Sequence, residues 1–518
     1  MTLTSDAPTR ETVATATNRG SRVRAVAAGI AIAAGVLLFS YSRSDLWLDE
    51  ALSVNIARLP LGDLRAALER DGAPPLYYVL LHGWTGLFGS GDIAARSPGA
   101  VFAVGAVVAC WYAARRCFDS TTAWLTVVVM ATNPYLIRYA TEARMYMLEV
   151  LLVACGIVVV LRALERPTFA RLALVGVVTA LLVYTQYWAF YLVGVVTVAF
   201  LVVAWRHPER RRGARRVVFA IGVGLLAFAP WIPTFLSQRA HTGTPWGDPV
   251  LPGLPIGETF LGFAGGHTQE GWLLLLVLLA VLGLGLLARA VDPRHLEVDL
   301  RVQPSARWIA CIGGATLVVG VSLNYLAGQA FQPRYSAIVF PFFALLLGRG
   351  LATLVDPRVQ FAVVAVIVAL GLAGGVRNLV TQRTRAGAVA TVLESEARRG
   401  DLVVYCPDQL GPAVHRLLPG GLDEVTYPEF AAPAFVDWVD YQRRIDAVDP
   451  QEFADTVAER AGAGTVWFVT GPGYPNHHGV CGAISARLAE SRDRVERVVP
   501  DETVFEKAGL QQFVSPVQ

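Results

Sequence analysis

Long apolar runs alternate with short polar segments between residues 25 and 376. About eleven of these runs come close to the ~18–20 residues that a helix needs to cross a bilayer. They lie at residues 25–41, 97–114, 121–137, 145–161, 170–186, 188–205, 217–236, 272–288, 308–327, 335–352 and 359–376. The pattern predicts an all-α polytopic transmembrane bundle.

The first apolar run, 25–41, follows a polar segment rich in Thr and Ala. A cleaved signal peptide is the competing interpretation, but its apolar core would be long and no small-residue cleavage site precedes Trp47. We therefore expect a disordered cytoplasmic N-terminus over 1–20 and a transmembrane domain over 21–378. Its first outside loop spans 42–96.

The pattern changes at residue 379, where charged residues appear throughout. Two short β-rich runs, 402–405 and 465–469, are separated by helical stretches, which predicts a small α/β domain over 379–518. Cys406 and Cys481 lie in this domain, and the sequence leaves open whether they form a disulfide.

Composition agrees with a membrane protein. Of the 518 residues, 54% are hydrophobic and 16% charged, and the mean hydropathy is +0.47. Ordinary soluble proteins carry about 25% charged residues. The net charge of +3 is too small to indicate a nucleic-acid partner.

Arginine is concentrated in alternate connections between the apolar runs. With the N-terminus in the cytoplasm, the inside connections are 115–116, 162–171, 207–216, 289–307 and 349–358, and each is basic. Cytoplasmic loops carry an excess of Lys and Arg. The rule therefore predicts that 42–96, 138–144, 328–334 and the C-terminal domain lie outside the cytoplasm.

Acidic residues gather in the first outside loop, directly after the first helix. Trp47 is expected at the membrane interface, which brings Asp49 and Glu50 to its surface. A carboxylate there stays ionised yet partly desolvated, a common setting for a general base. The alternative is that Asp49 caps a helix over 50–59, and spacing alone does not decide between the two.

The same loop continues through an Asp-Gly and a Pro-Pro pair, which impose a turn before the polar aromatics Tyr77, Tyr78 and His82. A loop of ~50 residues with its own short helices is usually functional. These three residues are candidates for contacting the acceptor or shaping the loop.

Two later outside segments carry isolated charges. Glu142 and Arg144 lie at the start of a helix, where a structural ion pair is the alternative interpretation. Arg334 precedes another helix, and a guanidinium suits phosphate binding, although an arginine at a helix end often only reaches for the interface. No predicted span has a charged residue near its centre, which argues against an ion-coupled transporter or a flippase.

Five motifs in this order resemble the GT-C superfamily of membrane glycosyltransferases, in particular its protein-mannosyltransferase and aminoarabinose-transferase-like branch. They read Leu-Trp-Leu-Asp-Glu-Ala, Pro-Pro-Leu-Tyr-Tyr, Ala-Arg-Ser-Pro-Gly-Ala, Thr-Glu-Ala-Arg-Met-Tyr and Pro-Arg-Tyr. The resemblance covers about residues 25–380 and is strongest over 45–150.

The resemblance implies an inverting transfer of a sugar from a polyprenyl-phosphate donor to an acceptor on the extracytoplasmic side of a bacterial plasma membrane. Mannose or a similar sugar is expected, and the acceptor is a glycan, a glycolipid or a protein. Asp49 matches the family's base, and Glu50 would orient the acceptor or Asp49. The residues expected to bind the donor or its phosphate are Glu142, Arg144, Tyr146, Arg334 and Tyr335.

A divalent metal is bound by some family members and not by others. In this chain Asp49 and Glu142 are the residues that would share one, and the sequence leaves the question open. A non-catalytic scaffold or sensor built on the C-terminal domain is a further alternative, in which Asp49 would be replaceable.

Overall fold

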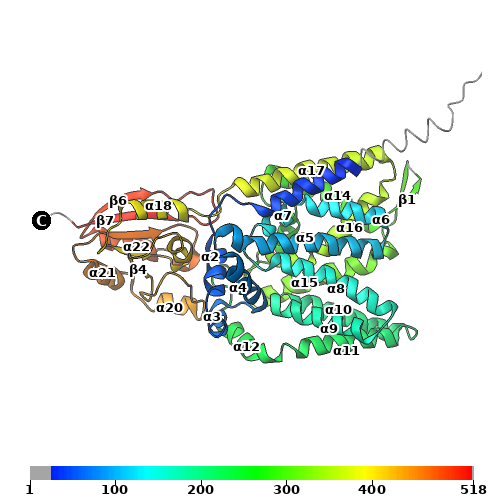
Figure 1. Cartoon of the computed structure of the whole chain (residues 1–518), viewed down its shortest axis with the longest axis horizontal. Helices are drawn as coiled ribbons and strands as arrows, with labels where there is room; N and C mark the ends of the chain where they lie inside the picture. Colours follow the sequence, from blue (N-terminus) through cyan, green and yellow to red (C-terminus); the bar gives the residue numbers. More distant parts are fainter. Residues whose placement is uncertain (1–24, 293, 516–518) are drawn as a thin grey trace, which may run out of the picture.

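The computed structural model describes residues 25–292 and 294–515, so the predicted N-terminal segment 1–20 lies outside the described residues. The chain forms an elongated helical bundle, with an α/β part at one of its ends (Figure 1). The predicted fold class, a helical transmembrane bundle with a small C-terminal α/β part, is confirmed. The exact domain boundaries stay predictions.

An apolar helix occurs at each predicted span. Among the described residues, eight segments are long and apolar enough to cross a membrane, and three shorter ones, Ala25–Ser40, Ser120–Ala131 and Phe169–Thr185, coincide with the remaining spans. The bundle helices are α5 (Asp92–Cys117), α6 (Ser120–Ala131), α7 (Pro134–Ala140), α8 (Tyr146–Glu165), α9 (Phe169–Thr185), α10 (Ala189–Arg206), α11 (Arg211–Leu226), α12 (Ile232–His241), α13 (Gly253–Phe263), α14 (Gln269–Leu287), α15 (Pro304–Leu326), α16 (Phe340–Thr353) and α17 (Pro357–Val380).

The predicted span 121–137 is broken into α6 and α7. Asn133 caps α7, because its side-chain oxygen accepts hydrogen bonds from the N–H groups of Tyr135 and Leu136. Pro134 occupies the first turn, where its missing N–H costs nothing. The break directs the chain after α7 into the turn that carries Glu142 and Arg144.

Helix α16 lies in the interior of the bundle, and nearly all of its residues are buried. Its packing against α14 depends on glycine. A Cβ atom at Gly350 would collide with the carbonyl oxygen of Val281, and one at Gly285 with that of Leu346. Small residues let transmembrane helices approach closely in this way.

Three short helices fold the first loop against the end of the bundle: α2 (Leu48–Ala57), α3 (Leu64–Asp71) and α4 (Leu76–Phe88). The predicted turn between the last two is confirmed. Gly72 ends α3 in the left-handed conformation, with φ of 83°, which only glycine adopts freely. Pro74 and Pro75 then lead into α4.

The C-terminal part contains a five-stranded sheet in the order β4-β3-β5-β7-β6. Strands β3 (Leu402–Tyr405), β4 (Asp423–Thr426) and β5 (Val466–Thr470) are parallel, whereas β7 (Gly509–Val514) pairs antiparallel with β5 and with β6 (Asp493–Val498). The accompanying helices are α18 (Ala386–Glu396), α19 (Gly411–His415), α20 (Tyr441–Asp446), α21 (Pro450–Ala461) and α22 (Val480–Ala489). The two predicted β-rich runs correspond to β3 and β5.

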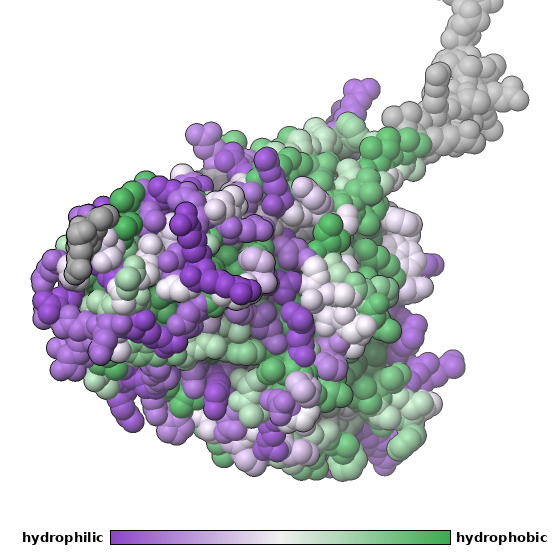
Figure 2. Space-filling view, turned by 60° about the vertical axis from the view of Figure 1, so that its left-hand side comes forward, coloured by the Kyte–Doolittle hydropathy of each residue, from purple (hydrophilic) through white to green (hydrophobic). Residues whose placement is uncertain are grey.

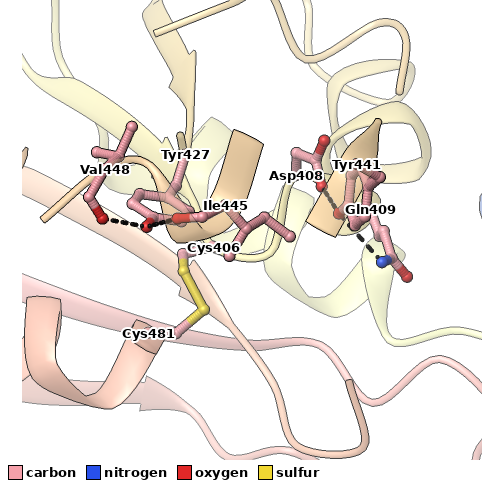
Figure 3. The surroundings of a disulfide bond; sticks show 8 residues. All are labelled: Cys406, Asp408, Gln409, Tyr427, Tyr441, Ile445, Val448 and Cys481. Carbon is pink, nitrogen blue, oxygen red and sulfur yellow. Dashed lines mark hydrogen bonds between the residues drawn. A yellow bond between two sulfur atoms is a disulfide. The ribbon is translucent and has the colours of Figure 1, made fainter. Parts of the chain in front are cut away.

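A disulfide joins Cys406, directly after β3, to Cys481 in α22, with the Cα atoms 5.5 Å apart (Figure 3). Tyr427 lies beside it, and its hydroxyl donates to the carbonyl oxygens of Ile445 and Val448. The possibility left open by the sequence is thus realised in the structure.

The β1–β2 hairpin (Ala288–Asp292 and His295–Val298) lies at the end of the bundle away from the C-terminal sheet (Figure 1). This hairpin belongs to the Arg-rich connection 289–307. Figure 2 shows hydrophilic residues over much of the C-terminal part and hydrophobic residues over the adjoining bundle.

Candidate active site

A cavity of about 740 Å³ lies between the bundle and the C-terminal part. The bundle side contributes residues 47–49, 71–74, 144–146 and 186–188, together with 242–246, 329, 330, 332, 334 and 335. The C-terminal side contributes Gln409, Trp438, 472–476 and 505–507. Such a volume suits a small-molecule substrate, and both parts of the chain are needed to form it.

Asp49 faces this cavity from the first turn of α2. The helix begins at Leu48 after an extended Trp47, and no side chain caps it locally. Asp49 is therefore not the cap residue, and the alternative function considered from the sequence is wrong. Its carboxylate is 19% exposed and lies 3.4 Å from the guanidinium of Arg334.

Glu50 points away from the cavity and is fully buried. Arg96 in α5 donates two hydrogen bonds to its carboxylate, at 2.7 and 2.6 Å, and the N–H of Ala143 donates a third. Burial raises the pKa of Glu50, but the charges of Arg96 and Arg383 outweigh it and lower the pKa to about 2. Glu50 thus anchors α2 to α5, and the prediction that it also orients Asp49 stays a prediction.

Arg144 and Tyr146 line the cavity, whereas Glu142 does not. The Arg144 guanidinium donates to Ser53 at 2.8 Å and to the Tyr78 hydroxyl at 3.3 Å. Tyr78 in turn donates to Asp71 at 2.7 Å. Burial raises the pKa of Asp71. This network fixes Arg144 against the base of α2.

Glu142 is buried and forms an ion pair with Arg138 at 2.8 Å. The structural ion pair considered from the sequence therefore exists for Glu142, but with Arg138 as its partner instead of Arg144. Glu142 does not reach the cavity directly.

Arg334 and Tyr335 both line the cavity. The Arg334 guanidinium lies over the rings of Trp47, Trp246 and Tyr335, with centroid distances of 5.4, 5.9 and 5.8 Å. Stacked aromatic rings hold a guanidinium flat and still charged. Arg334 is thus held in one orientation, with one side toward Asp49.

Three N–H groups around the cavity are buried and make no hydrogen bond within the described chain: the Nε atoms of Arg144 and Arg334 and the indole nitrogen of Trp47. A buried donor without a partner costs about 1–3 kcal/mol. A ligand rich in acceptor oxygens would satisfy such donors.

The remaining candidates of the first loop do not line the cavity. Tyr77 is fully buried beside Tyr78. His82 contacts the carbonyl oxygen of Ala57 through its Nδ1 atom, at 2.8 Å. Direct acceptor contact, which was one of the two expectations for Tyr77, Tyr78 and His82, has no support in this geometry.

Asp49 and Glu142 lack the surroundings of a metal site, because each carboxylate already faces a guanidinium. Within residues 25–292 and 294–515 no group of three or more His, Cys, Asp or Glu side chains is arranged to hold a metal ion. This pair of carboxylates does not fit a divalent metal.

Sequence reasoning missed several residues at this site. Arg96 stands inside the motif Ala-Arg-Ser-Pro-Gly-Ala, which was the available signal. Arg383, which lies 3.6 Å from Glu50, and Glu506, which lines the cavity, lie in segments without a motif. Glu149 in α8 is buried and takes a hydrogen bond from Gln186 once the amide nitrogen of Gln186 is turned toward it.

Comparisons with known proteins agree with this architecture. The family model described as dolichyl-phosphate-mannose-protein mannosyltransferase matches residues 72–234. The structure of ArnT from Cupriavidus metallidurans bound to undecaprenyl phosphate superposes with a TM-score of 0.59, over 95% of this chain and 98% of ArnT, at 14% identity. Both similarities agree with the resemblance to the GT-C superfamily that the sequence motifs indicate.

A second solved structure, the Archaeoglobus fulgidus oligosaccharyltransferase tethered with an acceptor peptide, gives a TM-score of 0.51 at 12% identity. It covers 95% of this chain and 74% of the oligosaccharyltransferase. None of the curated proteins compared with the chain matches it. At these low identities the likeness concerns the fold alone.

Proposed function

We propose that this protein is an integral membrane glycosyltransferase of the GT-C type that moves a sugar from a polyprenyl phosphate to an acceptor hydroxyl, with inversion. The observation that carries the proposal is the pairing of Asp49 with Arg334, 3.4 Å apart in one large cavity. An acid beside a phosphate-binding cation is what a transfer from a phosphate leaving group requires. The alternative of a transporter or flippase is not favoured.

Asp49 is the base in this proposal. The acceptor oxygen attacks the anomeric carbon of the sugar while its proton passes to the Asp49 carboxylate. The bond between that carbon and the phosphate oxygen breaks on the opposite face, and the polyprenyl phosphate leaves. A positioned base contributes about 10²–10⁴-fold to such a reaction.

Arg334 and Arg144 bind the donor phosphate in this proposal. Charge builds up on the phosphate as the bond breaks, and preorganised cations stabilise it without needing a proton. The unpartnered Nε atoms of both arginines supply donors for its oxygens. Tyr146 and Tyr335, which line the same wall, would flank the phosphate or the sugar.

The two parts of the cavity suit two substrates. A donor with a lipid tail must enter beside the bundle, so we assign the acceptor to the C-terminal side, where Gln409, Trp438 and Asn476 line the cavity. Aromatic rings and amides suit a glycan or a glycolipid. Mannose is the sugar we propose for the donor.

We further propose a bacterial plasma membrane location with the cavity outside the cytoplasm. The disulfide between Cys406 and Cys481 supports an oxidising compartment for the C-terminal part. The β1–β2 hairpin, which belongs to the basic connection 289–307, lies at the far end of the bundle (Figure 1) and supports a cytoplasmic location for that end.

The test is transfer by the purified full-length protein. It is incubated with polyprenyl phosphates carrying mannose, glucose, galactose or a pentose, and with a glycan acceptor. We expect one donor to be consumed, with inverted configuration in the product. If no donor is consumed with glycan, glycolipid or peptide acceptors, the proposed function is wrong.

A further inference from the structure

The N-terminus of α2 is capped by a residue from the other end of the chain. The first N–H groups of a helix have no partner within it, and the residue before α2, Trp47, supplies no side-chain cap. Instead the Leu48 N–H donates to the Glu506 carboxyl group at 3.0 Å. Leu48 immediately precedes Asp49, so this bond holds the backbone next to the cavity residue Asp49.

Glu506 is itself held from several sides. It is 3% exposed, and its second carboxyl oxygen is bonded to the Thr384 hydroxyl, which also accepts from the Ala386 N–H at 2.9 Å. The Glu506 backbone N–H donates to the Arg383 carbonyl at 2.9 Å. Because the Glu506 side chain is held by these bonds, it can in turn hold the Leu48 N–H in a fixed position.

The neighbouring residue adds a second contact to the same turn. The Phe505 ring packs edge-on against Trp47, with centroids 4.9 Å apart. Trp47 carries the Arg334 guanidinium on its ring. The loop through Phe505 and Glu506 therefore contacts both residues that precede Asp49, namely Trp47 and Leu48.

We propose that Glu506 is a positioning residue for the base Asp49, acting through the first turn of α2. Through this contact the C-terminal part of the chain contributes to the geometry of the proposed active site. The inference rests on the proposed function for its kinetic consequence, whereas the contact with α2 is testable without any transfer.

The charge state of Glu506 determines which substitution preserves its contacts. Burial, together with the charges of Asp49 and Glu50, raises its pKa to about 8 against the opposing effect of the hydrogen bonds from Thr384 and Leu48. Tyr474 is the titratable group that faces it from the 471–479 loop, and Arg383, Arg385 and Lys507 flank the contact. At neutral pH Glu506 is mostly protonated, and glutamine is then its close mimic.

The experiment compares Glu506→Ala and Glu506→Gln with the wild type. It uses the full-length protein and the donor that the transfer test identifies. We expect Glu506→Ala to lower kcat about tenfold, or about 1.4 kcal/mol, with the KM for the donor unchanged. Glu506→Gln should keep the wild-type kcat at pH 7.

Hydrogen exchange over residues 46–52 supplies the readout that needs no activity. Exchange should be faster in Glu506→Ala and unchanged in Glu506→Gln. Glu502→Gln is the matched control, because this acid lies in the same loop but is 71% exposed, and it should alter neither measurement.

Two results would overturn the inference: wild-type kcat and exchange in Glu506→Ala, or a raised KM at constant kcat, which would make Glu506 a substrate contact. If the wild type transfers no sugar at all, the proposed function fails, and the exchange comparison alone still decides whether Glu506 holds α2.

Discussion

Asp49 and Glu50 are neighbours in the sequence with opposite surroundings. Asp49 faces the cavity, and Glu50 is buried between two arginines. Consecutive helix residues point about 100° apart, so only one of them can face a given wall. The acidic pair was predictable from the sequence. Which of the two carboxylates faces the cavity depends on where α2 begins, and no local cap marks that position.

Asp49→Asn should lower kcat by about 10²–10⁴-fold, because the amide cannot take the acceptor proton. Membrane insertion and the elution profile in detergent should stay unchanged. Asp63→Asn, at an exposed position before α3, is the control and should keep full activity. If Asp71→Asn lost more activity than Asp49→Asn, the base would have to be reassigned to Asp71.

Arg334→Lys tests whether orientation matters as well as charge. Lysine keeps the cation but loses the planar fork that lies between three aromatic rings. We expect kcat to fall about 10²-fold, the scale of losing one preorganised donor. Arg210→Lys, at a 73% exposed position, should have no effect. Full activity of Arg334→Lys would contradict phosphate binding by the fork.

At the scale of the elements, the apolar runs predicted a helix at each of the eleven spans, because a span needs a long apolar run. They did not predict α13, which lies between two of these runs. They also could not predict the break at Asn133, where the helices remain apolar on both sides. In the C-terminal part, β3 and most of β5 are apolar, and both strands were predicted. Strands β4 and β6 carry charged residues, and only their pairing reveals them.

Glu50→Gln should destabilise the junction of α2 with α5. It leaves the buried Arg96 and Arg383 without their carboxylate partner, and breaking a buried pair costs about 3–5 kcal/mol. The measurement is thermal denaturation in detergent. Glu165→Gln, which removes a half-exposed partner of Arg116, is the control and should change the melting temperature little.

The same ion pair sets a pH dependence. The pKa of Glu50 is lowered to about 2 in the folded protein, from a usual 4.5. Its contribution to stability is therefore fully present above about pH 4.5 and is lost as the pH falls toward 2. Wild-type protein should lose melting temperature over this range more steeply than Glu50→Gln. Parallel curves for the two proteins would contradict the assignment.

At the scale of the whole molecule, the cavity exists only where two parts of the chain meet. The bundle was predictable, and so were Asp49, Arg144 and Arg334 as cavity residues, because they stand in motifs or isolated at helix ends. The C-terminal wall was not predictable. Gln409, Trp438 and Glu506 become neighbours of the bundle only through tertiary packing, for which a single sequence carries no local signal.

The orientation of the molecule is open to a labelling test. Glu490→Cys lies in the C-terminal part and Glu209→Cys in the Arg-rich connection, and both positions are exposed. In a background where the unpaired Cys110, Cys117, Cys155 and Cys311 are replaced by alanine, an impermeant maleimide added to intact cells should label only Glu490→Cys. Labelling of Glu209→Cys instead would invert the proposed topology.

Strand β7 follows β6 in the sequence yet lies between β5 and β6 in the sheet. During synthesis the bundle and strands β3 to β6 therefore leave the ribosome before β7, the strand that joins β5 to β6. A ribosome-bound chain that has not yet delivered Gly509–Val514 cannot complete the sheet that supports the loop of Glu506. The site would then be assembled only after translation has passed this strand, and a nascent chain would be unable to consume the lipid donor while still threading into the membrane.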